Sequence, residues 1–316
     1  MDFLTLLRDD IREGLAKTSP DFRARHTAWI LAQQCPEGGF ANRRGKVDLY
    51  YTGFALRSLS ALNELSASVA TKAVEWLLAI GHSPDAVRLR QPQGAFCDTV
   101  QAASWWDAVI LCEEAAARKC MDEAERLRLQ SLTFQRIESM RRADGGYAKT
   151  NIETHGSLYH TFLAASLHAR TGTPLPRSDE TRAFLRSLAR ADGGFIENKY
   201  SKRPGTNGTS AGVFLSLILN ELDVNEKHFE FMESMRNEEG GFEAAPSAPL
   251  ADLLSTYTAL LTLKMAGRLN SDLLDAAAQY ARSLEMAGGG YTGFALESTV
   301  DCEYTFYGLG VESIVA

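Results

Sequence analysis

Two kinds of helical segment alternate along the chain, and they differ in polarity. The first kind is apolar with few charges, as in Tyr51–Leu59, His160–Leu167, Ser210–Leu217, Thr256–Leu263 and Thr305–Val311. The second kind is amphipathic and carries more Glu, Arg and Lys, as in Arg23–Gln34 and Glu226–Arg236. Because a helix that is apolar on most sides must be buried, we expect the first kind to form an inner set of helices and the second an outer set facing solvent.

A short phrase of two small residues and an aromatic recurs between these segments. Its six copies are Gly38-Gly39-Phe40, Gly94-Ala95-Phe96, Gly145-Gly146-Tyr147, Gly193-Gly194-Phe195, Gly240-Gly241-Phe242 and Gly289-Gly290-Tyr291. Successive aromatics lie 56, 51, 48, 47 and 49 residues apart, a period typical of stacked supersecondary units. Glycine permits positive φ and close backbone approach, so each copy predicts a turn from an outer helix to an inner one.

Six such hairpins can close head to tail. We therefore predict an all-α fold, an (α/α)6 toroid of six helical hairpins over residues 22–316, with a central cavity. An open superhelix is the alternative architecture. No alternating strand pattern is present. The amphipathic segment Met1–Lys17 predicts a helix, within residues 1–21, that packs on the ring and is not a signal peptide.

Composition and charge limit the classes of partner that the protein can bind. The formal net charge is −7, so no basic face is available to neutralise phosphates, and we expect no nucleic-acid partner. No apolar run is long enough to predict a membrane span. The five cysteines are odd in number and show no CxxC spacing, which favours a reduced, cytoplasmic location.

Two copies of the repeat share a longer pattern. Gly38-Gly39-Phe40 is followed by Asp48-Leu49-Tyr50-Tyr51-Thr52, and Gly290-Tyr291 by Asp301-Cys302-Glu303-Tyr304-Thr305. A glycine–aromatic turn, then D-x-x-Y-T and an apolar helix, resembles the repeat of the prenyltransferase and squalene-cyclase family, from about residue 22 to 314. The resemblance implies the toroid of protein prenyltransferase β subunits and terpene cyclases, an isoprenoid ligand in its cavity, and a helical α subunit as partner.

The predicted inner helices carry aromatics suited to such a cavity. The candidate lining residues are Tyr51, Phe54, Trp105, Trp106, Tyr159, Phe162, Phe214, Tyr257, Tyr304, Phe306 and Tyr307. Electron-rich aromatic faces can hold an apolar polyene and stabilise allylic cations. The alternative is that each of these rings fills the core of the ring of helices.

The resemblance also implies a zinc site, made of Asp and Cys in D-x-C-Y and His in Y-H-T. His160 lies in Tyr159-His160-Thr161, and Asp301 with Cys302 resembles D-x-C-Y, but Glu303 stands where the cysteine belongs. A shift of one residue turns a helical side chain by about 100°. His160 also belongs to the third repeat and Asp301 to the sixth, on opposite walls of a ring, so a polar residue at a helix start is the alternative for His160.

Three aspartates share one place, just before an inner helix: Asp48, Asp252 and Asp301. Helix N-capping is one interpretation. The other uses the neighbourhood of repeats five, six and one, where these carboxylates with Glu303 could bind Mg²⁺ and a diphosphate, or leave one acid protonated. D-x-D-D, the acid motif of class II terpene cyclases, is absent, and Asp301 with Glu303 would be a variant D-x-E pair. We take Asp301, Glu303 and Tyr304 as the candidate catalytic residues.

Candidate residues for an anionic head group lie in two adjacent repeats. His155-Gly156 resembles the family's H-G, and the next repeat supplies Lys199, Lys202 and Arg203. Cations and helix N-termini suit a diphosphate, although an ordinary solvated loop is the alternative.

These observations predict an isoprenoid-processing enzyme, which performs prenyl transfer or terpene cyclisation on a polyprenyl diphosphate, with Mg²⁺ or Zn²⁺ as the candidate metals. The alternative is a non-catalytic toroid that binds an isoprenoid or a partner and has lost the zinc and acid motifs of the family. Function cannot be taken from the fold alone, because one fold hosts many sites.

Overall fold

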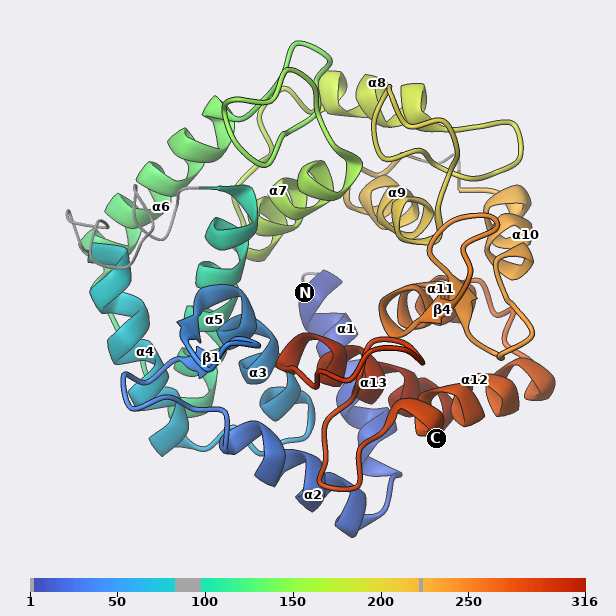
Figure 1. The fold of residues 1–316 in the computed structure, drawn as a ribbon. Coiled ribbons are helices and arrows are strands. Elements are labelled where there is room, and N and C mark those ends of the chain that lie inside the picture. Colours follow the sequence, from blue (N-terminus) through green and yellow to red (C-terminus); the bar gives the residue numbers. More distant parts are fainter. Residues whose placement is uncertain (1–2, 83–97, 222–223) are drawn as a thin grey trace.

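Six helices stand side by side as the inner wall of a ring, and six more surround them (Figure 1). The computed structural model describes residues 3–82, 98–221 and 224–316. The inner helices are α3 (Leu49–Ala61), α5 (Thr99–Ala116), α7 (Leu158–Arg170), α9 (Thr206–Ile218), α11 (Leu253–Met265) and α13 (Cys302–Val315). The outer helices are α2 (Pro20–Leu31), α4 (Ala67–His82), α6 (Glu123–Ser139), α8 (Ser178–Leu188), α10 (Glu226–Ser234) and α12 (Ser271–Leu284).

The predicted apolar segments all fall within inner helices, and the predicted toroid is confirmed. Its helices alternate as expected, because the apolar segments have no polar face to offer solvent. Two pairs of two-residue strands, β1 (Phe40–Ala41) with β2 (Val47–Asp48) and β3 (Phe242–Glu243) with β4 (Ala251–Asp252), were not predicted. They close loops of the first and fifth repeats and are too short to leave an alternating pattern.

One hydrogen-bonding pattern repeats at the described glycine–aromatic turns. The backbone N–H of the aromatic donates to a threonine Oγ1 one turn into the inner helix, as from Phe242 to Thr256 at 3.0 Å. The threonine hydroxyl donates in turn to the carbonyl of the N-cap residue, as from Thr256 to Asp252 at 2.7 Å. The same pair of bonds occurs at Phe40, Tyr147, Phe195 and Tyr291. The second copy, Gly94-Ala95-Phe96, lies outside the described residues.

The ring closes where the last repeat meets the first. Gly289 has φ +93°, and a Cβ there would lie 2.7 Å from the carbonyl oxygen of Arg25 on α2. The N–H of Gly290 donates to Nδ1 of His26 at 3.1 Å, and the His26 ring stacks on Tyr291 with centroids 5.1 Å apart. Since α13 also packs against α3, the alternative of an open superhelix is wrong.

Helix α1 (Phe3–Ala16) lies across the centre of the ring at the end of the inner helices where they finish (Figure 1). It packs against α3, α7 and α13. Lys264 of α11 donates to both oxygens of Asp10 at 2.7 and 2.8 Å, and Arg12 donates to the carbonyl of Ser60. These bonds fix α1 as the floor of the central space.

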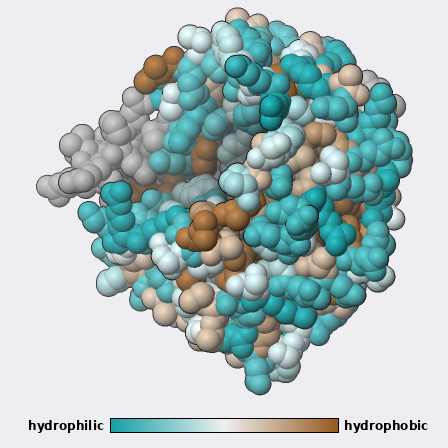
Figure 2. All heavy atoms as spheres, turned by 45° about the vertical axis from the view of Figure 1, so that its right-hand side comes forward, coloured by the Kyte–Doolittle hydropathy of each residue, from teal (hydrophilic) through white to brown (hydrophobic). Residues whose placement is uncertain are grey.

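Among the described residues, no helix is both long and apolar enough to span a lipid bilayer. Figure 2 shows one face of the molecule, on which hydrophilic residues dominate and hydrophobic ones form separate patches. The described cysteines, Cys35, Cys112, Cys120 and Cys302, are all free thiols, and Cys97 lies outside the described residues.

Candidate functional site

A cavity of about 520 Å³ occupies the centre of the ring. Every inner helix contributes to its wall, and α1 contributes Leu7, Arg8 and Ile11 at its deep end. On α3 the lining residues run from Tyr50 in the first turn to Ala61 at the last, which at 1.5 Å per residue is a depth of about 16 Å. The volume lies in the range of pockets that take a small organic ligand.

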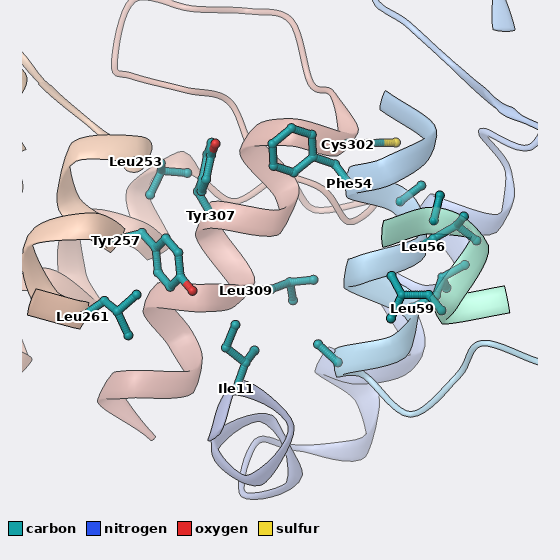
Figure 3. Close-up of a cluster of buried hydrophobic side chains, with 14 of the residues drawn as sticks. Ile11, Phe54, Leu56, Leu59, Leu253, Tyr257, Leu261, Cys302, Tyr307 and Leu309 are labelled. Carbon is teal, nitrogen blue, oxygen red and sulfur yellow. The ribbon is translucent and has the colours of Figure 1, made fainter. Parts of the chain in front are cut away.

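Aromatic side chains form much of the wall. Those that line the cavity are Tyr50, Phe54, Tyr159, Phe162, Phe214, Tyr257, Phe306 and Tyr307. Figure 3 shows Phe54, Tyr257 and Tyr307 approaching one another from three inner helices, with Ile11 of α1 below them. Phe54 and Tyr307 meet edge to face at 5.5 Å, and Tyr257 and Phe306 at 5.9 Å. Such a wall offers π faces and edges to a hydrocarbon chain.

Tyr159 illustrates how the wall is open to the cavity. It retains 38% of its accessible surface, although burial raises its pKa to about 12. Tyr159 is part of the cavity wall, which accounts for its being both partly exposed and set within the ring.

Glu303 lies in the first turn of α13, at the end of the cavity opposite α1. The hydroxyl of Tyr50 donates to Glu303 Oε1 at 2.7 Å. Burial raises the pKa of Glu303, with a further increase from the charge of Asp301, while the Tyr50 hydrogen bond and Arg43 act against it. A raised pKa shifts a carboxyl group towards its protonated form, in which it can act as an acid.

A second carboxyl group lies at the same level of the cavity. Glu197, from the loop before α9, accepts hydrogen bonds from the hydroxyl of Ser157 and from the N–H of Tyr159. Burial raises its pKa as well. We call the level of Glu197, Tyr50 and Glu303, at the first turns of the inner helices, the upper level of the cavity.

The deeper part of the cavity has a charged side. Arg57 of α3 donates through Nε to Asp107 of α5 at 2.6 Å, and its guanidinium lies over the Phe54 ring at 5.0 Å. Arg170, at the end of α7, approaches Asp107 to 3.6 Å. The facing helices α9, α11 and α13 supply Phe214, Leu261 and Tyr307.

Several residues that were predicted to line the cavity lie outside its lining. Trp105 and Trp106 are buried in the wall, where their indole N–H groups donate to the carbonyl of Leu77 on α4 and to Thr133 on α6. They were expected to line the cavity, and they do not, because their positions on α5 turn them towards the outer helices. Tyr51 and Tyr304 are also outside the lining; Arg43 lies over the Tyr304 ring at 5.5 Å.

The three aspartates cap their own helices. Oδ1 of Asp48 accepts from the N–H of Tyr50, Oδ1 of Asp252 from that of Ser255, and Oδ1 of Asp301 from that of Tyr304, at 2.8 to 2.9 Å. Asp301 also accepts from Arg43 Nε at 2.6 Å and is buried, but it is not part of the cavity lining. The capping interpretation is therefore confirmed for these residues.

The predicted metal ligands do not lie close together in the structure. Cys302 is buried, and burial holds its pKa well above the usual value of a thiol, while His160 Nδ1 lies 2.8 Å from Ser157 Oγ on the far side of the ring. Within residues 3–82, 98–221 and 224–316, His, Cys, Asp and Glu form no group of three that could hold a metal ion. The donor set therefore does not fit the predicted zinc site.

The predicted diphosphate ligands lie on exposed loops. Lys199, Lys202 and Arg203 are exposed and, like His155, are not part of the cavity lining. His155 and Lys199 both contact the ring of Tyr200, at 4.8 and 5.2 Å. These contacts bring two of the predicted diphosphate ligands, His155 and Lys199, close together, but outside the cavity.

Tyr50, Arg57, Asp107 and Glu197 line the cavity but were not predicted to do so. Arg57 did carry a signal, since it is the single charged residue within the apolar segment Tyr51–Leu59. Glu197 carried none, because it comes from a loop and its place depends on contacts with Ser157 and Tyr159 of the neighbouring repeat.

Comparison with known proteins gives the family. The prenyltransferase alpha-alpha toroid domain matches residues 4–178 and 172–316. Comparison with curated proteins finds no match. Among solved structures, a variant of the type II terpene cyclase MstE from Scytonema, in complex with its product merosterolic acid A, is similar with a TM-score of 0.60 and 12% identity, over 99% of this chain and 98% of that one.

Other structures of this fold have different activities. Protein geranylgeranyltransferase-I from Candida albicans, complexed with GGPP, is similar with a TM-score of 0.61 and 16% identity, over 85% of this chain and 87% of that one. A D-mannose isomerase reaches a TM-score of 0.60 at 12% identity, over 93% and 97%. At such identities the likeness shows the fold alone. With the family match along nearly its whole length and its six hairpins closed into a ring, the chain belongs to the prenyltransferase alpha-alpha toroid domain family.

Proposed function

We propose that this protein is an isoprenoid-processing enzyme that holds a polyprenyl chain in its central cavity and starts the cyclisation of that chain by proton transfer from Glu303. The observation that carries the proposal is the placement of Glu303, a carboxyl group of raised pKa, in the wall of an aromatic cavity and in hydrogen-bonding contact with Tyr50. Fold relatives that hold GGPP or geranylgeranyl dihydroxybenzoate support an isoprenoid ligand.

The chemistry follows from the arrangement. A proton leaves Glu303 for an alkene carbon, the π bond breaks, and the positive charge passes to the more substituted carbon. The carboxylate that remains keeps the hydrogen bond from Tyr50, which stabilises the charged form. A second alkene of the same chain attacks the cation, and a base finally removes a proton, so that none is consumed. Neighbouring aromatic faces stabilise the cation.

The residues favour cyclisation over diphosphate-dependent transfer. Prenyl transfer needs cations or a metal at the diphosphate, but the upper level of the cavity presents the carboxyl groups of Glu197 and Glu303. The arginines of the deeper part are paired with carboxylates, Arg57 with Asp107 and Arg170 with Asp107 and Glu114. His155, Lys199, Lys202 and Arg203 would have to bind the diphosphate outside the cavity, on the loops. Mg²⁺ carried in by a diphosphate substrate would provide another route to transfer.

Incubation with polyprenyl substrates, followed by mass analysis of organic extracts, tests the proposal. Geranylgeranyl diphosphate and geranylgeranyl-bearing acids or esters are each supplied with and without Mg²⁺ or Zn²⁺. A cyclic isomer of unchanged mass supports the proposal, whereas release of pyrophosphate points to prenyl transfer. Ligand-induced stabilisation without any product would identify a binding protein instead.

A further inference from the structure

The charges that line the cavity are separated along its depth. The upper level carries Glu197 and Glu303, both carboxyl groups. The deep end carries Arg8, Arg57 and Arg170, with Asp107 as the single carboxylate among the lining residues there. An anionic group inside the cavity is therefore attracted to the deep end and repelled from the upper level whenever the carboxyl groups there are ionised.

Arg57 presents free donors at this deep end. It uses Nε for Asp107, and within the described part of the chain no hydrogen bond uses its two terminal nitrogens. Its side chain keeps 29% of its accessible surface while lining the cavity. The guanidinium carbon lies over the Phe54 ring at 5.0 Å, and the outer edge of the group carries the N–H groups of the two terminal nitrogens. This edge matches the geometry of a carboxylate.

Two further guanidinium groups support Arg57. Arg170 is 5% exposed and lies 3.6 Å from both Asp107 and Glu114. Arg8 of α1 pairs with Glu114 and Asp9. Glu114 and Asp9 are each 44% exposed, so solvent screens their charges more than those of the arginines that face the cavity. Three guanidinium groups and one carboxylate therefore line the deep end itself.

We propose that Arg57, supported by Arg170 and Arg8, binds a carboxylate on the head group of the substrate. The substrate is then a polyprenyl chain that ends in an acid, with the head group deep in the cavity and the alkene furthest from it beside Glu303. Arg57 lies seven positions after Tyr50 on α3, so the two levels of the cavity are about 10 Å apart along the helix axis. This inference rests on the proposed function for its reactive end.

Binding measurements test the subsite independently of any reaction. Geranylgeranoic acid, its methyl ester and geranylgeraniol are titrated near pH 7, where a free carboxylic acid is ionised. We expect the acid to bind wild-type protein about tenfold more tightly than the ester or the alcohol. Asp107→Asn removes the carboxylate that competes for Arg57, so it should strengthen binding of the acid and leave that of the ester unchanged.

A paired variant removes Arg57 together with its partner Asp107, while Arg170 keeps Glu114 as an ion-pair partner. Arg57→Met/Asp107→Leu keeps apolar volume on both helices and should fold, because exchanging a whole ion pair for apolar side chains costs little. It should bind acid and ester equally. Arg186→Met, on the outer helix α8, is the control for loss of one positive charge and should keep the preference for the acid.

The binding measurements can also contradict the inference in three ways. If acid, ester and alcohol bind wild-type protein equally well, the cavity takes isoprenoids but the carboxylate subsite is refuted. If Asp107→Asn weakens the acid and the ester alike, the pair is a structural one and the inference is overturned. If none of the three probes binds, the proposed function fails together with the subsite.

Discussion

The hydroxyl of Tyr50 on α3 donates a 2.7 Å hydrogen bond to Glu303 on α13, and so joins the first and the last inner helix across the seam where the ring closes. The two residues are 253 positions apart in the chain, yet they form one unit at the upper level of the cavity. Closure of the ring therefore completes the candidate acid.

Tyr50→Phe should shift the pH dependence of cyclisation. The Tyr50 hydrogen bond lowers the pKa of Glu303 against the larger effect of burial, so its loss raises that pKa further. Because the protonated carboxyl is the active form, activity falls as the pH rises through the pKa of the folded protein, and this fall should move to higher pH in the variant. The measurement is the initial rate across a pH series. A profile unchanged in Tyr50→Phe would argue against Glu303 as the acid.

Glu312→Gln should stabilise the protein at neutral pH. Glu312 is buried on α13, its Oε1 has no hydrogen-bond partner in the described structure, and burial raises its pKa to about 6. A raised carboxyl pKa means that the folded state binds the proton more tightly than the unfolded state. The cost is therefore present above the folded pKa and disappears as the pH falls through it towards the ordinary value of 4.5. A pKa shift of this size corresponds to a loss of about 2 kcal/mol in the free energy of unfolding.

Urea unfolding of Glu312→Gln and wild type near pH 8 and near pH 4 measures this difference. The gain should be about 2 kcal/mol at the higher pH and close to zero at the lower one. Glu230→Gln, on the exposed face of α10, is the matched control and should change little at either pH. Equal effects of both substitutions would show that burial of Glu312 has no such cost.

Gly289→Ala should destabilise the ring at its seam by about 2 to 4 kcal/mol, because φ is +93° and the new Cβ would lie 2.7 Å from the Arg25 carbonyl oxygen. The adjacent Gly288 has nothing within 4 Å of such a Cβ, so Gly288→Ala should change stability by less than about 1 kcal/mol. The change in unfolding free energy of each variant is obtained from its denaturant midpoint, provided that the dependence of that free energy on denaturant concentration is unchanged. Similar losses in the two variants would mean that contact at the seam does not limit stability.

Trp106→Phe should lower stability without changing the affinity for an isoprenoid. The indole N–H donates to Thr133 at 2.9 Å in the buried wall, and its loss should cost about 1 to 3 kcal/mol. Phe306→Leu, in the cavity lining, should instead weaken ligand binding. Thermal unfolding with and without a bound polyprenyl ligand separates the two effects. Weaker binding in Trp106→Phe would place that residue in the ligand site.

The fold could be predicted from the sequence because its cause is local and repeated. Five inner helices contain an apolar segment with at most one charged residue, and the described turns use glycine, as the positive φ at Gly38 and the close carbonyl of Lys72 show. The cavity lining could be predicted only in part. Helical spacing gives the faces of a helix but not which face points to the centre, so Phe54 and Trp106 looked alike although only Phe54 reaches the cavity.

Pairs that form between neighbouring inner helices could not be predicted from the sequence. Arg57 and Asp107 are 50 positions apart, and neither forms a motif with its neighbours in the chain. Asp301 and Glu303 form one D-x-E phrase, yet two residues along a helix turn a side chain by about 200°, so Asp301 caps α13 beside Arg43 while Glu303 faces the cavity.

The most direct test of the account compares wild type with Glu303→Gln in the presence of one polyprenyl substrate, with bound ligand and cyclised product measured in the same samples. We predict that the variant binds the substrate as well as wild type does, because glutamine keeps the shape of the side chain, and that it forms no cyclic product. Cyclisation at an undiminished rate by Glu303→Gln would contradict the central claim.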